Sequence, residues 1–251
     1  MMMNYYRMMN KEEVKIDFAS TNNPPQVLLD EIHASGSEYY QLSDRKNVLA
    51  YFFALKKLCR GYDAIHVHAN SAMAVMELQA AIWAGIKIRI IHNHNSRSQH
   101  NLLNQLFLSL YRRSFTQAVA CSDEAGEWLY GKNGFITLRN AINAKRFKFD
   151  VVKRLIMRHN FGFGDDEYVI GHIGKFMEAK NHSFLIEVFA KYHALQPKSK
   201  LLLIGDGELR HLVEAAIDKN KVNDCVILAG LRSDISDVLQ AMDIFLFPSI
   251  Y

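Results

Sequence analysis

The 251-residue chain is 49% hydrophobic and 22% charged, an ordinary globular composition with enough length for one large domain or two of moderate size. It has no low-complexity tract and no internal repeat, which excludes a disordered chain and a solenoid. The net charge of +4 is uneven: residues 1–150 hold 18 Lys and Arg against 13 Asp and Glu, and residues 151–251 hold 12 against 13. This modest basic excess favours phosphate groups or a lipid surface as partners, and it is too weak to indicate nucleic acid.

The cysteines and the apolar runs indicate in which cellular compartment the protein resides. Cys59, Cys121 and Cys225 lie far apart and form no C-x-x-C pair, which indicates reduced thiols in a reducing environment. The first residues lack the apolar core of a signal peptide, and no run of about 18 apolar residues is available to span a bilayer. These features predict a soluble, cytoplasmic protein.

Short aliphatic runs alternate along the chain with longer segments of helical period. Most of these runs are continuously apolar, as in parallel sheets that helices cover on both faces. Helical periodicity is clear in Phe184–Leu195 and Leu209–Ile217. The alternation predicts an α/β protein with doubly wound, Rossmann-like parallel sheets. The predicted strands are Val14–Phe18, Ala64–Val67, Ile86–Ile91, Ala118–Cys121, Tyr168–Ile173, Leu201–Ile204, Val226–Leu228 and Ile244–Phe247.

The alternation is interrupted in residues 139–165 by a charged stretch and a glycine-containing turn. We therefore expect a domain boundary near residue 148, with one domain in residues 1–148 and a second in residues 149–251. Two such domains that face each other would leave a cleft between them, where ligands usually bind.

The segment from residue 170 to residue 186 carries the clearest indication of a ligand site. Its predicted strand ends at Gly174, a short loop holds Lys175 and Lys180, and a helix begins near Asn181. The unpaired amides of a helix N-terminus together with two lysines suit a diphosphate group. The alternative, that both lysines are ordinary solvated loop residues, is equally compatible with the spacing. The glycine pair Gly205 and Gly207 follows the next strand, where it permits close backbone approach to a ligand or forms a plain turn.

Two histidine pairs follow strands in the first half of the chain: His66 with His68, and His92 with His94. Residues i and i+2 of a strand face the same way, so each pair is conceivable as part of a metal site. No cysteine or acidic residue lies nearby at ligand spacing, and we therefore expect no metal. A polar role in the cleft is expected for His92 and His94, and a structural, hydrogen-bonded role for His66 and His68.

The segment Leu102–Phe115 has leucines and aromatic residues at helical spacing and contains Arg112 and Arg113. Such an amphipathic helix could touch a membrane surface. An apolar stripe of this kind more often faces the core, which is the interpretation we prefer.

Taken together, these segments resemble the retaining glycosyltransferases of family 4, which have the GT-B fold, and most closely the bacterial exopolysaccharide and capsule enzymes. The resemblance spans nearly the whole chain in the order that the family has. The segments that carry it are Met3-Asn-Tyr-Tyr-Arg, Ile65-His-Val-His-Ala-Asn, His92-Asn-His-Asn, Ala120-Cys-Ser-Asp-Glu-Ala-Gly, Gly171-His-Ile-Gly-Lys-Phe with Lys180-Asn-His, Leu203-Ile-Gly-Asp-Gly, Leu228-Ala-Gly-Leu-Arg-Ser-Asp-Ile and Ala241-Met-Asp-Ile-Phe-Leu-Phe-Pro-Ser.

The resemblance implies transfer of a sugar, with retained configuration, from a nucleotide-diphosphate sugar to a glycan or lipid-linked acceptor. A UDP-sugar is the expected co-substrate, with neither a cofactor nor a metal, in a cytoplasmic protein that can sit at the inner face of the membrane. His94 and His92 would lie near the reacting sugar. Residues 1–148 would be the acceptor-side domain and residues 149–251 the nucleotide-sugar-binding domain. The expected donor-binding residues are Gly174, Lys175, Lys180, Asn181, Gly205, Gly207, Leu231 and Arg232.

The chain also departs from the family pattern. Lys175 replaces a frequent arginine, which removes any bidentate phosphate contact, and Arg139 and Asn143 replace the proline and aspartate of the interdomain motif. The family's glycine loop would precede the first residue and its paired glutamates would follow Tyr251, so we expect a chain shortened at both ends and inactive by itself. Two alternatives stay open: a non-catalytic, nucleotide-binding remnant or interaction module, and a nucleotide-sugar epimerase of the same fold.

Overall fold

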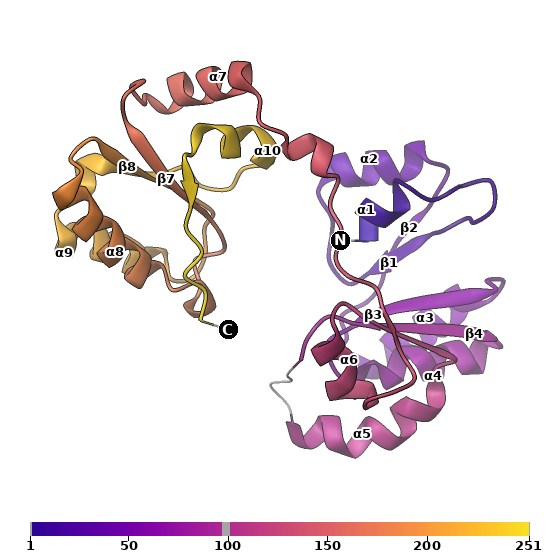
Figure 1. Cartoon of the computed structure of the whole chain (residues 1–251). Helices are drawn as coiled ribbons and strands as arrows, with labels where there is room; N and C mark the ends of the chain where they lie inside the picture. The colour runs from indigo at the N-terminus through magenta and orange to yellow at the C-terminus, as the bar shows by residue number, and fades with distance from the viewer. Residues whose placement is uncertain (1, 97–100, 251) are drawn as a thin grey trace. The chain divides into compact units, whose positions relative to one another are not determined.

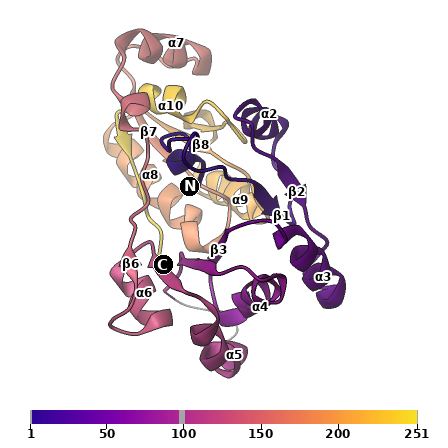
Figure 2. The same cartoon turned by 90° about the vertical axis from the view of Figure 1, so that its right-hand side faces the viewer.

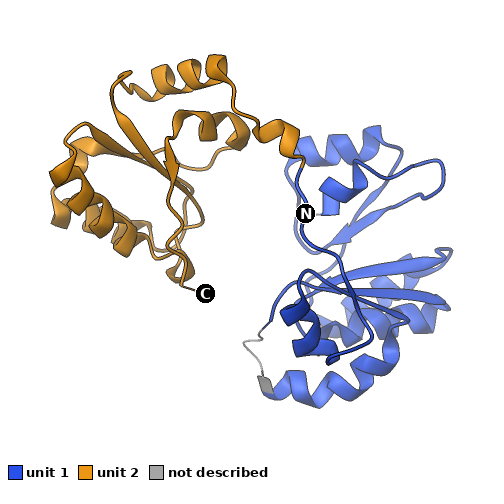
Figure 3. Ribbon diagram, in the orientation of Figure 1, with its two compact units in different colours: residues 1–142 blue, residues 143–251 orange. Residues whose placement is uncertain are grey.

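The computed structural model describes residues 2–96 and 101–250, apart from the side chain of Asn101. The chain divides into two compact units, residues 1–142 and residues 143–251 (Figure 3). The division falls shortly before residue 148, the boundary that the charged stretch suggests. Within the described residues, no helix is both long enough and apolar enough to cross a lipid bilayer.

The first unit contains two parallel sheets. Strand β1 (Phe18–Ser20) pairs with β2 (Tyr39–Gln41), and the larger sheet has the order β3-β4-β5-β6. Its strands are β3 (Ala64–Ala69), β4 (Ile88–Asn93), β5 (Gln117–Ala120) and β6 (Ile136–Thr137). The helices of this unit are α1 (Met2–Tyr6), which precedes β1, and α2 (Gln26–Ala34), α3 (Val48–Cys59), α4 (Val75–Ala84), α5 (Asn101–Ser114) and α6 (Asp123–Tyr130), with a 3₁₀ turn at Ala72–Ala74 (Figure 1).

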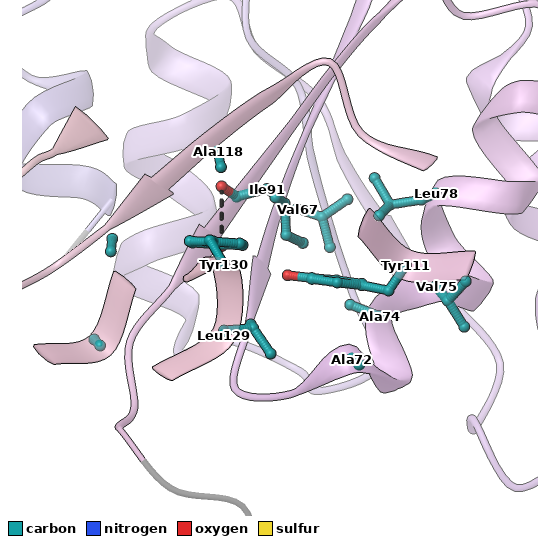
Figure 4. Close-up of a cluster of buried hydrophobic side chains, with 12 residues drawn as sticks. Val67, Ala72, Ala74, Val75, Leu78, Ile91, Tyr111, Ala118, Leu129 and Tyr130 are labelled. Atoms are coloured by element: carbon teal, nitrogen blue, oxygen red, sulfur yellow. Dashed lines mark hydrogen bonds between the residues drawn. The ribbon is translucent and has the colours of Figure 1, made fainter. Parts of the chain in front are cut away.

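Residues of the larger sheet are buried against these helices. Figure 4 shows the rings of Tyr111 from α5 and Tyr130 from α6 among buried side chains that include Val67 and Ile91. The Tyr130 hydroxyl donates to the Ile91 carbonyl at 3.5 Å and to the Val119 carbonyl at 3.2 Å, so this buried polar group has partners. A second cluster joins α3 to α4, which lie near β3 in Figure 2.

The second unit has one parallel sheet of order β10-β7-β8-β9. Its strands are β7 (Tyr168–Ile173), β8 (Ser199–Ile204), β9 (Val226–Leu228) and β10 (Ile244–Phe245). Its helices are α7 (Val151–Phe161), α8 (His182–Leu195), α9 (Arg210–Asn220) and α10 (Ile235–Val238), with 3₁₀ turns at Ala144–Phe147, Glu178–Lys180, Asn223–Cys225 and Leu239–Ala241.

Both faces of this sheet are covered, as the continuous apolar runs predict. Leu201 and Leu203 of β8 pack in the cluster that includes α8 and α9. Leu202 and Ile204 point the other way, into a cluster with Val238 of α10 and with Phe163, which follows α7. Because successive residues of a strand face opposite sides, a helix layer on each face buries the whole strand. The prediction of doubly wound parallel sheets is confirmed.

Several local predictions differ from the structure. Val14–Phe18 is not a strand: β1 begins only at Phe18, because the first ladder bond is the one that the Phe18 amide donates to the Glu38 carbonyl. Strands β2 and β6 are not predicted, since three and two paired residues are too few to show an alternating pattern.

The core-facing interpretation of α5 is wrong for four leucines. Leu102, Leu103, Leu106 and Leu110 are 84%, 44%, 71% and 48% exposed. The helix instead buries the row that contains Asn104, Tyr111 and Ser114, with the Asn104 side chain accepting from the Ala72 amide at 2.7 Å. Apolar residues therefore extend around α5 beyond the face that contacts the core.

Candidate functional site

The loops that follow β7, β8 and β9 line a pocket of about 830 Å³ in the second unit. These loops leave the carboxyl ends of parallel strands, which is where open α/β sheets bind ligands. The lining residues are Ile173, Gly174, Lys175, Ile204, Gly205, Asp206, Gly207, Leu231, Arg232 and Ile235. The structure thus gathers six of the residues expected to bind the donor: Gly174, Lys175, Gly205, Gly207, Leu231 and Arg232.

Gly205 and Gly207 allow the loops after β7 and β8 to come into direct contact. Gly205 has φ +136°, and a Cβ there would overlap the carbonyl oxygen of Gly174. A Cβ at Gly207 would lie 2.5 Å from the carbonyl oxygen of Phe176. The contact between these two loops therefore requires glycine at both positions.

Main-chain hydrogen bonds fix the same loops. The Gly174 amide donates to the Ile204 carbonyl at 2.9 Å, and the Phe176 amide donates to the Asp206 carbonyl at 3.0 Å. The Gly205 amide donates to the Gly230 carbonyl at 2.8 Å, which ties in the loop after β9. These bonds do not involve side chains, so the frame of the pocket depends on the backbone.

The two lysines have different surroundings. Lys175 Nζ lies 2.8 Å from Glu208 Oε2, and this hydrogen bond holds the pKa of the Glu208 carboxyl below its ordinary value. Lys180 is outside the set of lining residues, but its stem passes Gly174, where an added Cβ would be 3.3 Å from Lys180 Cγ. Lys180 Nζ lies 4.9 Å from the centre of the Phe247 ring. Glu208 is not among the site residues expected from the sequence. Its position just after Gly207 is the one indication in the sequence that it could pair with Lys175.

Asn181 lies at the start of α8 in the left-handed conformation, with φ +51° and ψ +47°. It makes no side-chain hydrogen bond as a cap, so the first amides of α8 remain available to a ligand. Beneath this turn the His182 ring packs edge-on against Phe176 at 4.6 Å between ring centres. Burial, with the nearby His172 and Lys180, lowers the pKa of His182 to about 4, which keeps this imidazole neutral.

Arg232 and Asp206 are the remaining charged residues of the pocket. The Arg232 guanidinium donates to both carboxyl oxygens of Asp234, at 2.8 and 2.5 Å. Its carbon Cζ lies 5.7 Å from the centre of the Phe161 ring. Asp206 accepts from the Gly207 amide at 2.8 Å and pairs with Arg210 at 3.3 Å. The apolar residues Ile173, Ile204, Leu231 and Ile235 complete a pocket that suits a ligand with one flat apolar part and one charged part.

The two histidine pairs come together in the first unit. Strands β3 and β4 pair in parallel with His68 opposite His92. The ring centres of His66 and His68 are 4.5 Å apart, those of His68 and His92 are 5.1 Å apart, and those of His92 and His94 are 4.3 Å apart. His68 Nδ1 and His94 Nε2 are hydrogen-bonded at 2.8 Å. Burial, aided by neighbouring imidazoles, lowers the pKa of His92 to about 4, and the pKa values of the other three are lowered as well, chiefly by burial.

This grouping corrects the view that each pair lacks a third ligand. His66, His68 and His92 each offer a ring nitrogen, and the three nitrogens lie within 4.8 Å of one another. The structural, hydrogen-bonded role expected for His66 is also not seen, since its Nε2 is buried with no partner among the described residues.

Comparison with known proteins identifies the second unit. Residues 153–251 match the family described as glycosyl transferases group 1. Residues 153–251 are a group 1 glycosyltransferase domain. The pocket at the ends of β7, β8 and β9 lies within this glycosyltransferase domain.

Similarity to proteins named as glycosyltransferases extends over the whole chain. The protein named as glycosyltransferase EpsF of Bacillus subtilis strain 168 is 28% identical over 100% of this chain and 69% of its own length. The UDP-Gal:alpha-D-GlcNAc-diphosphoundecaprenol alpha-1,3-galactosyltransferase of Escherichia coli is 23% identical over 84% of this chain and 57% of its own length. The family resemblance found in the sequence is thereby confirmed.

The solved structure of Anabaena Alr3699/HepE in complex with UDP and glucose matches 92% of this chain and 66% of its own, with a TM-score of 0.76 and 18% identity. This likeness confirms the GT-B fold class.

Proposed function

We propose that the protein is a retaining glycosyltransferase that moves a sugar from a UDP-sugar to a glycan or lipid-linked acceptor during synthesis of a bacterial surface polysaccharide. The observation that carries this proposal is the pocket of the group 1 domain, which combines apolar walls with Lys175, Arg232 and the nearby start of α8. UDP in the Anabaena neighbour and the UDP-galactose in the name of the Escherichia coli relative support the choice of donor.

In this proposal the uracil and ribose lie against Leu231, Ile235 and Arg232. The diphosphate lies nearer Lys175 and Lys180, where it replaces Glu208 as the partner of the Lys175 ammonium group. Negative charge on the diphosphate grows as the bond to the sugar breaks, so fixed cations and helix amides stabilise the transition state more than the ground state. These groups take the place of a metal ion on the diphosphate. His94 and His92, which belong to the first unit, keep their expected role toward the transferred sugar as part of the proposal.

The decisive variant is Lys180→Ala. Loss of one preorganised contact to a developing anion typically costs about 2.7–4 kcal/mol, so we expect turnover to fall by about 100-fold or more. Calorimetric titration should also show weaker UDP binding. Lys191→Ala, at an exposed position further along the same helix, is the matched control and should bind UDP as the wild type does. Equal UDP affinity in both variants would contradict the assignment, and loss of UDP binding in EDTA would contradict a metal-free diphosphate site.

A second part of the proposal concerns the membrane. The exposed leucines of α5, with exposed Arg113 in the last turn, form an apolar and basic surface that suits an anionic lipid face. A lipid-linked acceptor, such as the one named for the Escherichia coli relative, would be presented at that face. Leu102→Ser with Leu106→Ser should reduce co-sedimentation with phosphatidylglycerol vesicles. Leu212→Ser, at a 47% exposed leucine of α9, should leave it unchanged.

A further inference from the structure

The four histidines of the first unit form a group with an unusual set of unsatisfied atoms. His66 Nε2, both ring nitrogens of His92 and His94 Nδ1 are buried, and none has a hydrogen-bond partner among the described residues. A buried polar atom without a partner typically costs about 1–3 kcal/mol, so the unpaired nitrogens of His66 and His92 favour a ligand that binds them.

The register of the sheet brings these atoms together. His66 and His68 project from the same face of β3, and the parallel ladder sets His68 beside His92 of β4. One nitrogen from each of these three rings lies within 4.8 Å of the other two. Bonds of about 2.0–2.1 Å to a tetrahedral zinc ion place its ligand nitrogens about 3.3 Å apart, so modest rotation of the side chains would close the set around one ion.

We propose that His66, His68 and His92 bind a divalent transition-metal ion, zinc in the first instance. Imidazole nitrogens suit zinc and the other late first-row metals, whereas magnesium and calcium require oxygen ligands. Three protein ligands leave the fourth tetrahedral position to water. The site differs from the diphosphate pocket, which belongs to the other unit, although it shares His92 with the residues assigned to the sugar transfer.

His94 has a supporting part in this site. Ligating histidines commonly donate their second ring N–H to a neighbour, which fixes the tautomer and the orientation of the ring. His68 does this when its Nδ1–H donates to His94 Nε2, 2.8 Å away, and His68 Nε2 then keeps the lone pair that binds the metal. His94 is thus a positioning residue for His68.

The test is calorimetric titration of ZnCl₂ into the untagged full chain, stripped with EDTA and exchanged into chelator-free buffer. We expect one zinc ion per chain. His68→Asn should weaken zinc binding by more than about 100-fold, and His94→Asn should weaken it by about 10- to 100-fold, as is typical for a residue behind a ligand. Circular dichroism verifies that the His68→Asn protein keeps its fold. His211→Asn, at an exposed histidine of α9, is the control and should bind zinc as the wild type does.

X-ray absorption at the zinc edge gives an independent measurement. The wild-type complex should show imidazole scattering from three ligands, and the His66→Asn complex should show fewer. Absence of stoichiometric zinc from the wild type, or equal affinity in His68→Asn and His211→Asn, would overturn the proposal. UDP binding by the same zinc-free protein separates this outcome from failure of the proposed function.

Discussion

At the scale of single residues, Gly205 determines how near the loops after β7 and β8 can come to each other. We expect Gly205→Ala to destabilise the second unit by about 1–3 kcal/mol, because it combines a strained backbone conformation with a clash against the Gly174 carbonyl. The variant should also bind UDP more weakly, since the loops that line the pocket must separate. Urea unfolding and UDP titration measure the two effects.

Gly164→Ala is the matched control for Gly205→Ala. A Cβ there would meet nothing closer than an ordinary contact of 3.4 Å with Asp166, and Gly164 does not line the pocket. It should retain wild-type UDP affinity. A Gly205→Ala protein as stable as Gly164→Ala would show that the loop contact is not a constraint.

His182 predicts a dependence of stability on pH. Its pKa is about 4 in the folded protein, below the ordinary value of about 6.5 for an exposed imidazole. The unfolded chain therefore binds the proton more readily, so the stabilisation is complete above about pH 6.5 and is lost as pH falls towards 4. The free energy of unfolding should decrease with a slope of at most about 1.4 kcal/mol per pH unit from this one group. Urea unfolding curves measured at a series of pH values give this dependence. The free energy of unfolding of His182→Leu should change less steeply with pH than that of the wild type, and an equal dependence on pH would contradict the assignment.

At the scale of elements, Arg158 joins α7 to the end of the sheet. Its side chain is 4% exposed and donates to the carbonyls of Gly164 and Glu167 at 2.6 Å and to Asp243 Oδ2 at 3.3 Å. Arg158→Ala should cost about 3 kcal/mol, because it leaves these buried acceptors unpaired. The midpoint of urea unfolding measures the loss.

Lys153 on the same helix provides the comparison. It pairs with Asp237 at 2.6 Å on the surface, where water competes for both charges. Lys153→Ala should therefore move the midpoint far less than Arg158→Ala does. Similar shifts for the two variants would mean that Arg158 is not a structural link.

Elements with a long local pattern are the ones that could be predicted from the sequence. Tyr168–Ile173 and Val226–Leu228 are predicted with the bounds that the structure has, because each is a mostly apolar run beside a clear turn or helix. The pocket residues around Gly174 and Gly205 could be predicted too, since strand ends in parallel sheets meet at one edge. The histidine group could not be predicted, because His92 lies beside His66 and His68 only through the register between β3 and β4. Register is set by packing of whole strands and leaves no signal in a segment of six residues.

At the scale of the whole molecule, each unit has cores of its own. Val67 and Leu78 belong to a cluster confined to the first unit, and Ile170 and Phe189 to a cluster confined to the second. Ligands of the two proposed sites should therefore protect different amides from hydrogen exchange. We expect UDP to slow exchange after β7 and β8, and zinc to slow exchange in β3 and β4. EDTA should abolish only the second effect, and protection of the same peptides by both ligands would contradict the separation of the sites.

The hydrogen bonds between the three pocket loops also bear on how this protein can diverge from its relatives. Every bond in that set joins one peptide group to another, at Gly174, Phe176 and Gly205. A mutation that alters Leu231 or Ile235 changes the wall that a nucleotide base would meet, yet it removes none of these bonds. Substitutions among a few wall residues can therefore change what the pocket accepts while the loop frame stays intact, as long as Gly205 and Gly207 are kept.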